Sequence, residues 1–146
     1  MAQKWIRAAL FAAFGAVVLA VSVGPGATAQ DKKAEKIPSI KQIMVAAHKG
    51  DDTLITKVKA AVKDGKWEDA QKAAKTLSEN GVALGKNKPR RGETSSWETL
   101  TKAYAESTKA VADATEKKDA EATTKALDTI GDSCKACHQA HRGKGK

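Results

Sequence analysis

The residues with the clearest chemical signature lie near the C-terminal end of the chain, where Cys134, Cys137 and His138 form a C-x-x-C-H motif. This spacing is the attachment signature of a c-type haem. Each thiol can add to a haem vinyl group, and the adjacent imidazole can ligate the iron of the same haem. On a helix, positions i, i+3 and i+4 share one face, so the three side chains would point the same way. The sequence therefore predicts one covalently attached haem c (iron) per chain, with His138 as the proximal iron ligand.

Two other kinds of site use cysteines at this spacing. A structural zinc site could draw on Cys134, Cys137, His138 and His141, but four ligands within eight residues of one helix cannot surround a tetrahedral ion. A thioredoxin-like C-x-x-C is expected beside a βαβ pattern, with its reactive thiol at a helix N-terminus. Here the motif falls late in an apparently helical stretch. A haem-free helical module with a redox-active C-x-x-C is therefore kept as the third hypothesis.

The N-terminal segment has the features of a secretory signal peptide. Two basic residues precede an uncharged run of 16 apolar or small residues, 8–23, and residues 27–29 form an A-x-A cleavage site. The run is shorter than the roughly 20 residues that span a bilayer. We expect cleavage of residues 1–29, a periplasmic or otherwise exported domain over 30–146, and no stable membrane span afterwards. A retained membrane anchor is the alternative.

The chain is basic, with a formal net charge of +9, two positive charges of which (Lys4 and Arg7) belong to the predicted signal peptide. Lysine dominates and aromatic residues are few, which does not favour nucleic-acid binding. A solvated basic surface that steers an acidic redox partner protein fits this composition better. No motif of a hydrolase, P-loop enzyme or metalloprotease is present, so we expect that the protein is not an enzyme.

Helical spacing of apolar residues begins directly after Ser39. The apolar positions keep their phase past Gly50, which predicts one helix that is bent or interrupted there and ends near Gly65. These positions are Ile40, Ile43, Met44, Ala47, Leu54, Val58, Ala61 and Val62.

A second helical stripe covers residues 67–84, and Asn80-Gly81 is expected to weaken its last turns. Residues 85–92 form a loop with four basic residues, whose simplest interpretation is a solvated connection. The third helix is predicted to begin with a capping box formed by Ser95 and Glu98.

The last helix is predicted to start at Asp119 as N-cap and to carry the C-x-x-C-H motif. No alternating, strand-like run bounded by hairpin turns is present. Amphipathic helices joined by short loops predict an all-α fold, an antiparallel up-down four-helix bundle with the haem motif on the last helix.

The segment Gly131–Arg142, with its C-K-A-C-H sequence on the last of four helices, resembles the class II c-type cytochromes, the cytochrome c′ family. The resemblance implies a haem held in a four-helix bundle, with Arg142 near a haem propionate, and it allows a homodimer through the first two helices. The family usually has Tyr or Phe where this chain has His141. That histidine would either pack on the haem or lie on the surface, the commoner outcome.

By the same resemblance, the first helix supplies the second axial position of the iron. Met44 and His48 are spaced i, i+4 on that helix, and counting from its two ends favours different residues. His48 is the candidate distal ligand and Met44 the alternative, while an ordinary core methionine and a surface histidine would leave the site open. A ligated site implies one-electron transfer, and an open site implies binding of small gases such as NO or CO. We predict the first function, with the second as the alternative.

Overall fold

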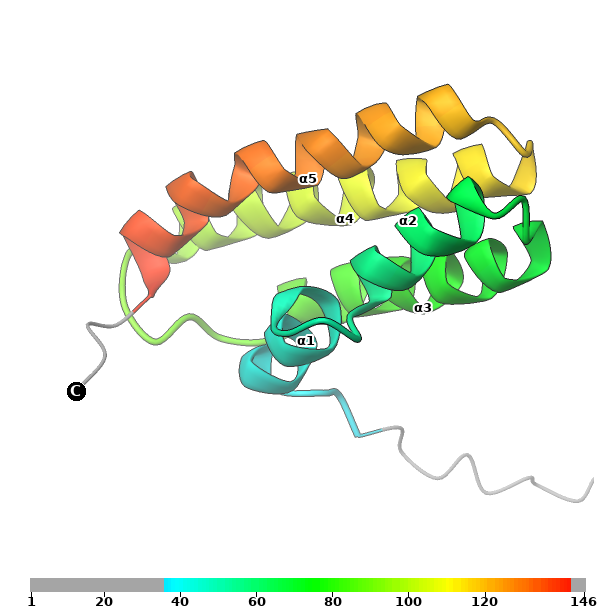
Figure 1. Ribbon diagram of the computed structural model, residues 1–146. Coiled ribbons are helices and arrows are strands. Elements are labelled where there is room, and N and C mark those ends of the chain that lie inside the picture. Colours follow the sequence, from blue (N-terminus) through cyan, green and yellow to red (C-terminus); the bar gives the residue numbers. More distant parts are fainter. Residues whose placement is uncertain (1–35, 143–146) are drawn as a thin grey trace, which may run out of the picture. The chain divides into compact units, whose positions relative to one another are not determined.

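The computed structural model describes residues 36–142, and this part of the chain contains five α-helices and no strand (Figure 1). They are α1 (Ile40–His48), α2 (Leu54–Lys63), α3 (Trp67–Gly85), α4 (Thr94–Glu116) and α5 (Ala120–His141). Helix α2 packs against α3, α3 against α4, and α4 against α5. The predicted all-helical class is confirmed.

The predicted signal peptide, residues 1–29, and the last residues, 143–146, lie outside the described residues. Among the helices between them, none combines the length and the apolar character needed to cross a bilayer.

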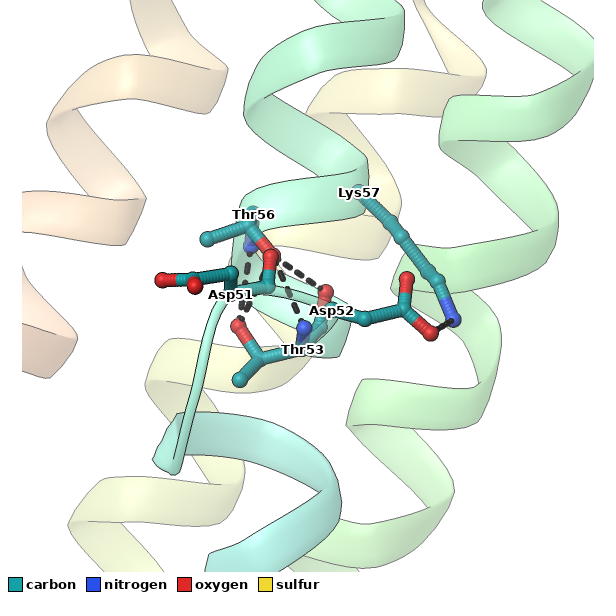
Figure 2. Close-up of polar contacts among 5 residues, drawn as sticks. All are labelled: Asp51, Asp52, Thr53, Thr56 and Lys57. Carbon is teal, nitrogen blue, oxygen red and sulfur yellow. Dashed lines mark hydrogen bonds and ion pairs between the residues drawn. The ribbon is translucent and has the colours of Figure 1, made fainter.

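The helix expected to be bent or interrupted at Gly50 is interrupted there, and the structure has two helices, α1 and α2. Gly50 adopts φ +101°, a left-handed conformation that glycine accepts without a steric penalty. Thr53 then caps α2: its Oγ1 accepts the Thr56 amide at 3.2 Å, and its own amide donates to Thr56 Oγ1 at 2.8 Å (Figure 2). The Thr56 hydroxyl also donates to the carbonyl of Asp51 at 2.8 Å. This capping box starts α2 as a separate helix, and His48 is the last residue of α1.

Other predicted helix ends are confirmed. Ser39 forms a capping box with Gln42 at the start of α1. Asp119 accepts the amide of Ala122 at 2.9 Å at the start of α5. Gly65, just after α2, adopts φ +69°, the left-handed conformation that commonly terminates a helix.

The capping box predicted for Ser95 and Glu98 is wrong. Helix α4 begins at Thr94, after Glu93, and no side chain caps its first turn. Ser95 is therefore inside the helix, where its hydroxyl cannot take the cap position. The neighbouring serine, Ser96, has a different role at the C-terminal end of α5.

The core consists of small and medium-sized apolar side chains and includes several threonines. Its hydroxyls are satisfied locally: those of Thr101, Thr108, Thr115 and Thr123 each donate to a carbonyl three or four residues earlier in the chain. The fully buried apolar residues include Ile43, Ala47, Val58, Ala70, Ala74, Leu77, Val111 and Ile130. So small an apolar core provides modest stability, which makes close contact between helices important.

Helix α3 continues past Asn80 and Gly81 as far as Gly85, and Gly81 is buried against α4. A Cβ atom at this position would collide with Thr108 Oγ1 and lie 3.2 Å from the Cα of Ala105. The absence of a side chain at Gly81 therefore allows α3 and α4 to approach closely.

Replacing Gly81 with alanine should destabilise the protein. The collision with α4 should cost about 1–3 kcal/mol, whereas replacing glycine with alanine gains at most about 1 kcal/mol in helix propensity, so the net effect is destabilising. Gly131→Ala is the matched control, because nothing lies within 4 Å of a Cβ atom there, and it should be neutral or stabilising. Denaturant unfolding of both variants measures the difference. Equal stabilisation of both would contradict the close helix contact.

Candidate haem-attachment site

The C-x-x-C-H motif occupies the last turns of α5, as expected. Cys134 and Cys137 are free thiols, each half-buried, and His138 is exposed. The Cys134 thiol lies 3.4 Å from the carbonyl oxygen of Ile130, and Cys137 packs against the hydrophobic core. Two thiols and an imidazole therefore share one face of the helix at the edge of the protein.

The environment of the cysteines differs from that of a thioredoxin-like site. Burial raises the pKa of Cys137, and the nearby charge of Cys134 adds to this effect. Reactive thiols of redox enzymes instead have a lowered pKa, commonly at a helix N-terminus. In this chain both cysteines lie in the second half of α5, far from its N-terminus. The structure thus argues against the haem-free redox module.

His48 lies at the C-terminal end of α1 and contacts α4. Its Nε2 is 2.8 Å from the hydroxyl oxygen of Tyr104, and the two ring centroids are 5.8 Å apart. His48 is half-buried, so it is not the surface histidine of the simplest interpretation. Burial lowers the pKa of His48, and a smaller contribution comes from His138 on α5.

Tyr104 was not expected to belong to the site. It is 7% exposed, and burial, with a smaller effect of Cys134, raises its pKa well above the ordinary value, so the hydroxyl stays protonated. Because His138 affects His48 and Cys134 affects Tyr104, these two side chains lie within electrostatic range of the motif. The structure therefore joins His48 of α1 to Tyr104 of α4 by a hydrogen bond, with the motif on α5 near enough to affect the pKa values of both. Sequence spacing gave no signal for this contact, since residues 48 and 104 are far apart in the chain.

Met44 lies one turn before His48 on α1 and is half-buried. Its side chain packs against the hydrophobic core, the usual place of a structural methionine. Of the two candidates for the second axial position, His48 is the one with electrostatic and hydrogen-bonding links to α4 and α5.

His141 is buried, with 5% of its surface exposed, so the prediction of a surface histidine is wrong. Its Nδ1 donates to the carbonyl oxygen of Arg91 at 2.8 Å, and its Nε2 lies 3.1 Å from Ser96 Oγ. The ring also meets Trp97 edge-on, with centroids 5.2 Å apart. His141 thereby attaches the end of α5 both to α4 and to the preceding loop. Its two ring nitrogens are used away from the cysteines, which does not suit a zinc site.

The loop between α3 and α4, residues 86–93, is held closely against this end of α5. Gly92 adopts φ +83°, and a Cβ atom there would lie 2.7 Å from both Ala140 O and His141 Nδ1. At the other end of the loop, the indole N–H of Trp97 donates to the carbonyl of Asn87 at 2.8 Å. The backbone of the loop is therefore fixed next to the motif, while its four basic side chains, Lys86, Lys88, Arg90 and Arg91, are exposed.

Arg142 directly follows α5, and its backbone N–H donates to the carbonyl of His138 at 3.1 Å. Its side chain is exposed, and a contact with a haem propionate remains a prediction. Within residues 36–142, no group of three or more His, Cys, Asp or Glu residues is placed to hold a metal ion. The two grooves found on this part of the surface, between α2 and α3 and between α3 and α4, do not include the motif.

This set of donors fits a c-type haem. Two free thiols three residues apart, on the same helical face as an imidazole, match the chemistry of two thioether bonds and one iron ligand. The fold and the site thus define a helical protein with a haem-attachment motif on its last helix.

Comparison with known families agrees with this class. The family model described as Cytochrome C' matches residues 92–142, which include α4 and α5. The match confirms the resemblance: this segment is similar to the Cytochrome C' family of class II c-type cytochromes, and this family implies a c-type haem. No curated protein and no solved structure gives a significant match.

Replacing His141 with alanine should lower stability by about 1–3 kcal/mol. The change removes two hydrogen bonds and an aromatic contact, and it leaves a cavity beside Trp97. Gln139→Ala is a matched control on an exposed position of the same turn. Unfolding of the haem-loaded forms measures the effect. Equal stability of the two variants would show that His141 does not hold the end of α5.

Proposed function

We propose that this chain is an exported monohaem c-type cytochrome that transfers one electron at a time. The observation that carries the proposal is the donor set of Cys134, Cys137 and His138 on one accessible face of α5. When bound, haem c supplies one-electron chemistry by cycling between Fe(III) and Fe(II). We expect no substrate chemistry beyond this.

We infer that the helices form the antiparallel up-down four-helix bundle expected from the sequence, with α1 and α2 together in place of the first helix. Two observations support the topology. Connections of three residues join α2 to α3 and α4 to α5, and the helices of each pair pack side by side (Figure 1). Helix α2 also contacts α5, which closes the bundle.

Within this bundle, each residue of the motif and its neighbours would have a distinct role in holding the haem. Cys134 and Cys137 would form the thioether bonds, and His138 would ligate the iron from α5. Arg142 would lie near a propionate. His141 would fix the segment that carries these groups, because its hydrogen bonds join it to α4 and to the loop. Export, supported by the signal-like residues 1–29, would place the thiols where c-type haem is attached.

The acidic redox partner expected from the composition would dock at the loop of residues 86–93. This loop carries four exposed cations, and its backbone is fixed beside the end of α5 through His141 and Trp97. A rigid cationic surface next to the motif would favour an orientation of an acidic partner that brings the two redox centres close.

A second function, binding of small gases, is favoured by one specific observation. The Nε2 atom of His48 is engaged by the Tyr104 hydroxyl, so this nitrogen is not free to ligate a metal while that hydrogen bond persists. An axial position without a protein ligand would accept NO or CO.

Haem attachment is the first test. When the chain is expressed with haem-attachment machinery, its mass should include one haem per chain. Cys134→Ser and Cys137→Ser should each reduce stable attachment, and the double variant should abolish it, because each thiol forms one thioether bond. Ser133→Ala, a neighbouring change that removes no thiol, is the control. A wild-type mass without haem would reject both functions. A low-spin absorption spectrum unchanged by CO would favour electron transfer, and a high-spin spectrum with CO uptake would favour gas binding.

Partner docking is tested by reversing charge on the loop. Lys88→Glu combined with Arg90→Glu should slow oxidation of the reduced protein by the anion hexacyanoferrate(III), on the order of tenfold at low salt, and flatten the salt dependence. Lys59→Glu combined with Lys75→Glu, on α2 and α3, changes the net charge equally at other exposed positions. Equal slowing by both pairs would mean that net charge alone acts, and that the loop is not the docking surface.

A further inference from the structure

The hydrogen bond between His48 and Tyr104 engages the residue that is the candidate for the second axial position of the iron. It joins α1 to α4, its donor–acceptor distance is 2.8 Å, and its tyrosine is almost fully buried. His48 is the last residue of α1, just before the turn at Gly50, so the side chain sits at the end of a short helix.

Either tautomer of His48 leaves Nε2 unable to bind a metal while the hydrogen bond exists. If Tyr104 donates, the lone pair of Nε2 is used. If Nε2 donates, it carries a proton and has no lone pair in the ring plane. Ligation of an iron through Nε2 would therefore require this hydrogen bond to break.

We propose that Tyr104 is a positioning residue that competes with the haem iron for Nε2 of His48. While His48 is hydrogen-bonded to Tyr104, it would leave a bound haem able to take a small gas. If His48 instead ligated the iron, the haem would be suited to electron transfer. This inference rests on the proposed haem function and adds the means by which one chain controls its open and closed forms.

The size of the effect follows from linkage. A net hydrogen bond of ordinary strength shifts an equilibrium about fivefold. Because CO binds the open form alone, loss of the Tyr104 hydroxyl should lower CO affinity by up to this factor. If the open form is the major one in the wild type, the same loss should appear as a larger low-spin fraction in the absorption spectrum.

The experiment compares the haem-loaded wild type with Tyr104→Phe, His48→Ala and the double variant. The readouts are the ferric spin state and CO titration of the reduced protein. Tyr104→Phe should lower CO affinity about fivefold or raise the low-spin fraction. His48→Ala should remove the low-spin form and raise CO affinity, and in its background Tyr104→Phe should have no effect. Met44→Ala, one turn earlier on α1, should leave both readouts close to the wild type.

A second measurement does not depend on a variant. Tyr104 is the only tyrosine in the chain, so replacing all tyrosine with 3-fluorotyrosine changes this hydroxyl alone. The fluorinated phenol is a stronger donor and a weaker acceptor, so CO affinity should rise if the hydroxyl donates to Nε2 and fall if Nε2 donates to the hydroxyl, and an unchanged affinity would reject the competition. This protein keeps the hydroxyl and the packing, which covers the case in which Tyr104→Phe fails to fold.

The outcomes distinguish a failure of this inference from a failure of the proposed haem function. A mass without covalent haem rejects the proposed function and this inference with it. Haem attached, but with CO affinity and spin state unchanged in Tyr104→Phe or in His48→Ala, rejects the competition alone. The competition is also rejected if Tyr104→Phe has the same effect with and without His48, because the tyrosine would then act through packing.

Discussion

The placement of the haem motif depends on one buried contact, the ring of His141 between α4 and the loop of residues 86–93. Without it, the last two turns of α5 would be a helix end held mainly by the half-buried Cys137 and by residues further back, such as Ile130. With it, both ring nitrogens are hydrogen-bonded and the ring packs edge-to-face with Trp97. A haem attached through two cysteines has a defined position in the bundle only if the cysteines are held in place relative to the other helices. A fixed helix end meets this requirement. The same contact fixes the cationic loop beside the motif, so the site and its proposed docking surface share one support.

The core explains why such local supports matter. Its apolar side chains are mostly alanine, valine, leucine and isoleucine, and several buried positions are threonines that satisfy their hydroxyls within their own helix. Threonines of this kind fill space but contribute little hydrophobic stabilisation. The close approach of α3 to α4 at Gly81 compensates in part, because dispersion contacts increase as backbones come together. A haem would add a large apolar surface to this core, which would couple haem retention to folding.

Local sequence signals predicted much of this fold, and long-range contacts account for what they missed. The caps at Ser39 and Asp119 and the helical periods depend on neighbouring residues, and the structure has them as expected. Glycines were harder to interpret: Gly50 separates two helices, whereas Gly81 lies inside one, because a partner helix rather than the local sequence decides the second case. His141 and Tyr104 were misjudged or overlooked for the same reason. The groups that bury them, Ser96 and Arg91 for one and His48 for the other, are distant in sequence. The C-x-x-C-H motif could be recognised without any long-range contact, since its chemistry lies within five consecutive residues.

The shortest helix of the described residues, α1, is the one that carries His48, the candidate for the second axial position. Helix α1 has nine residues, fewer than an isolated helix needs for stability, and only Ile43 and Ala47 within it are buried. The turn at Gly50 separates it from α2, so α2 does not extend its hydrogen-bonded ladder. An element held by so few contacts can shift at a cost comparable to one hydrogen bond. For that reason a single hydrogen bond from Tyr104 would have a larger effect on the position of α1 than the same bond would have on a long helix such as α3 or α4. On the proposed competition, the interruption after His48 would matter for this reason, because a continuous first helix would hold the histidine more firmly in one position.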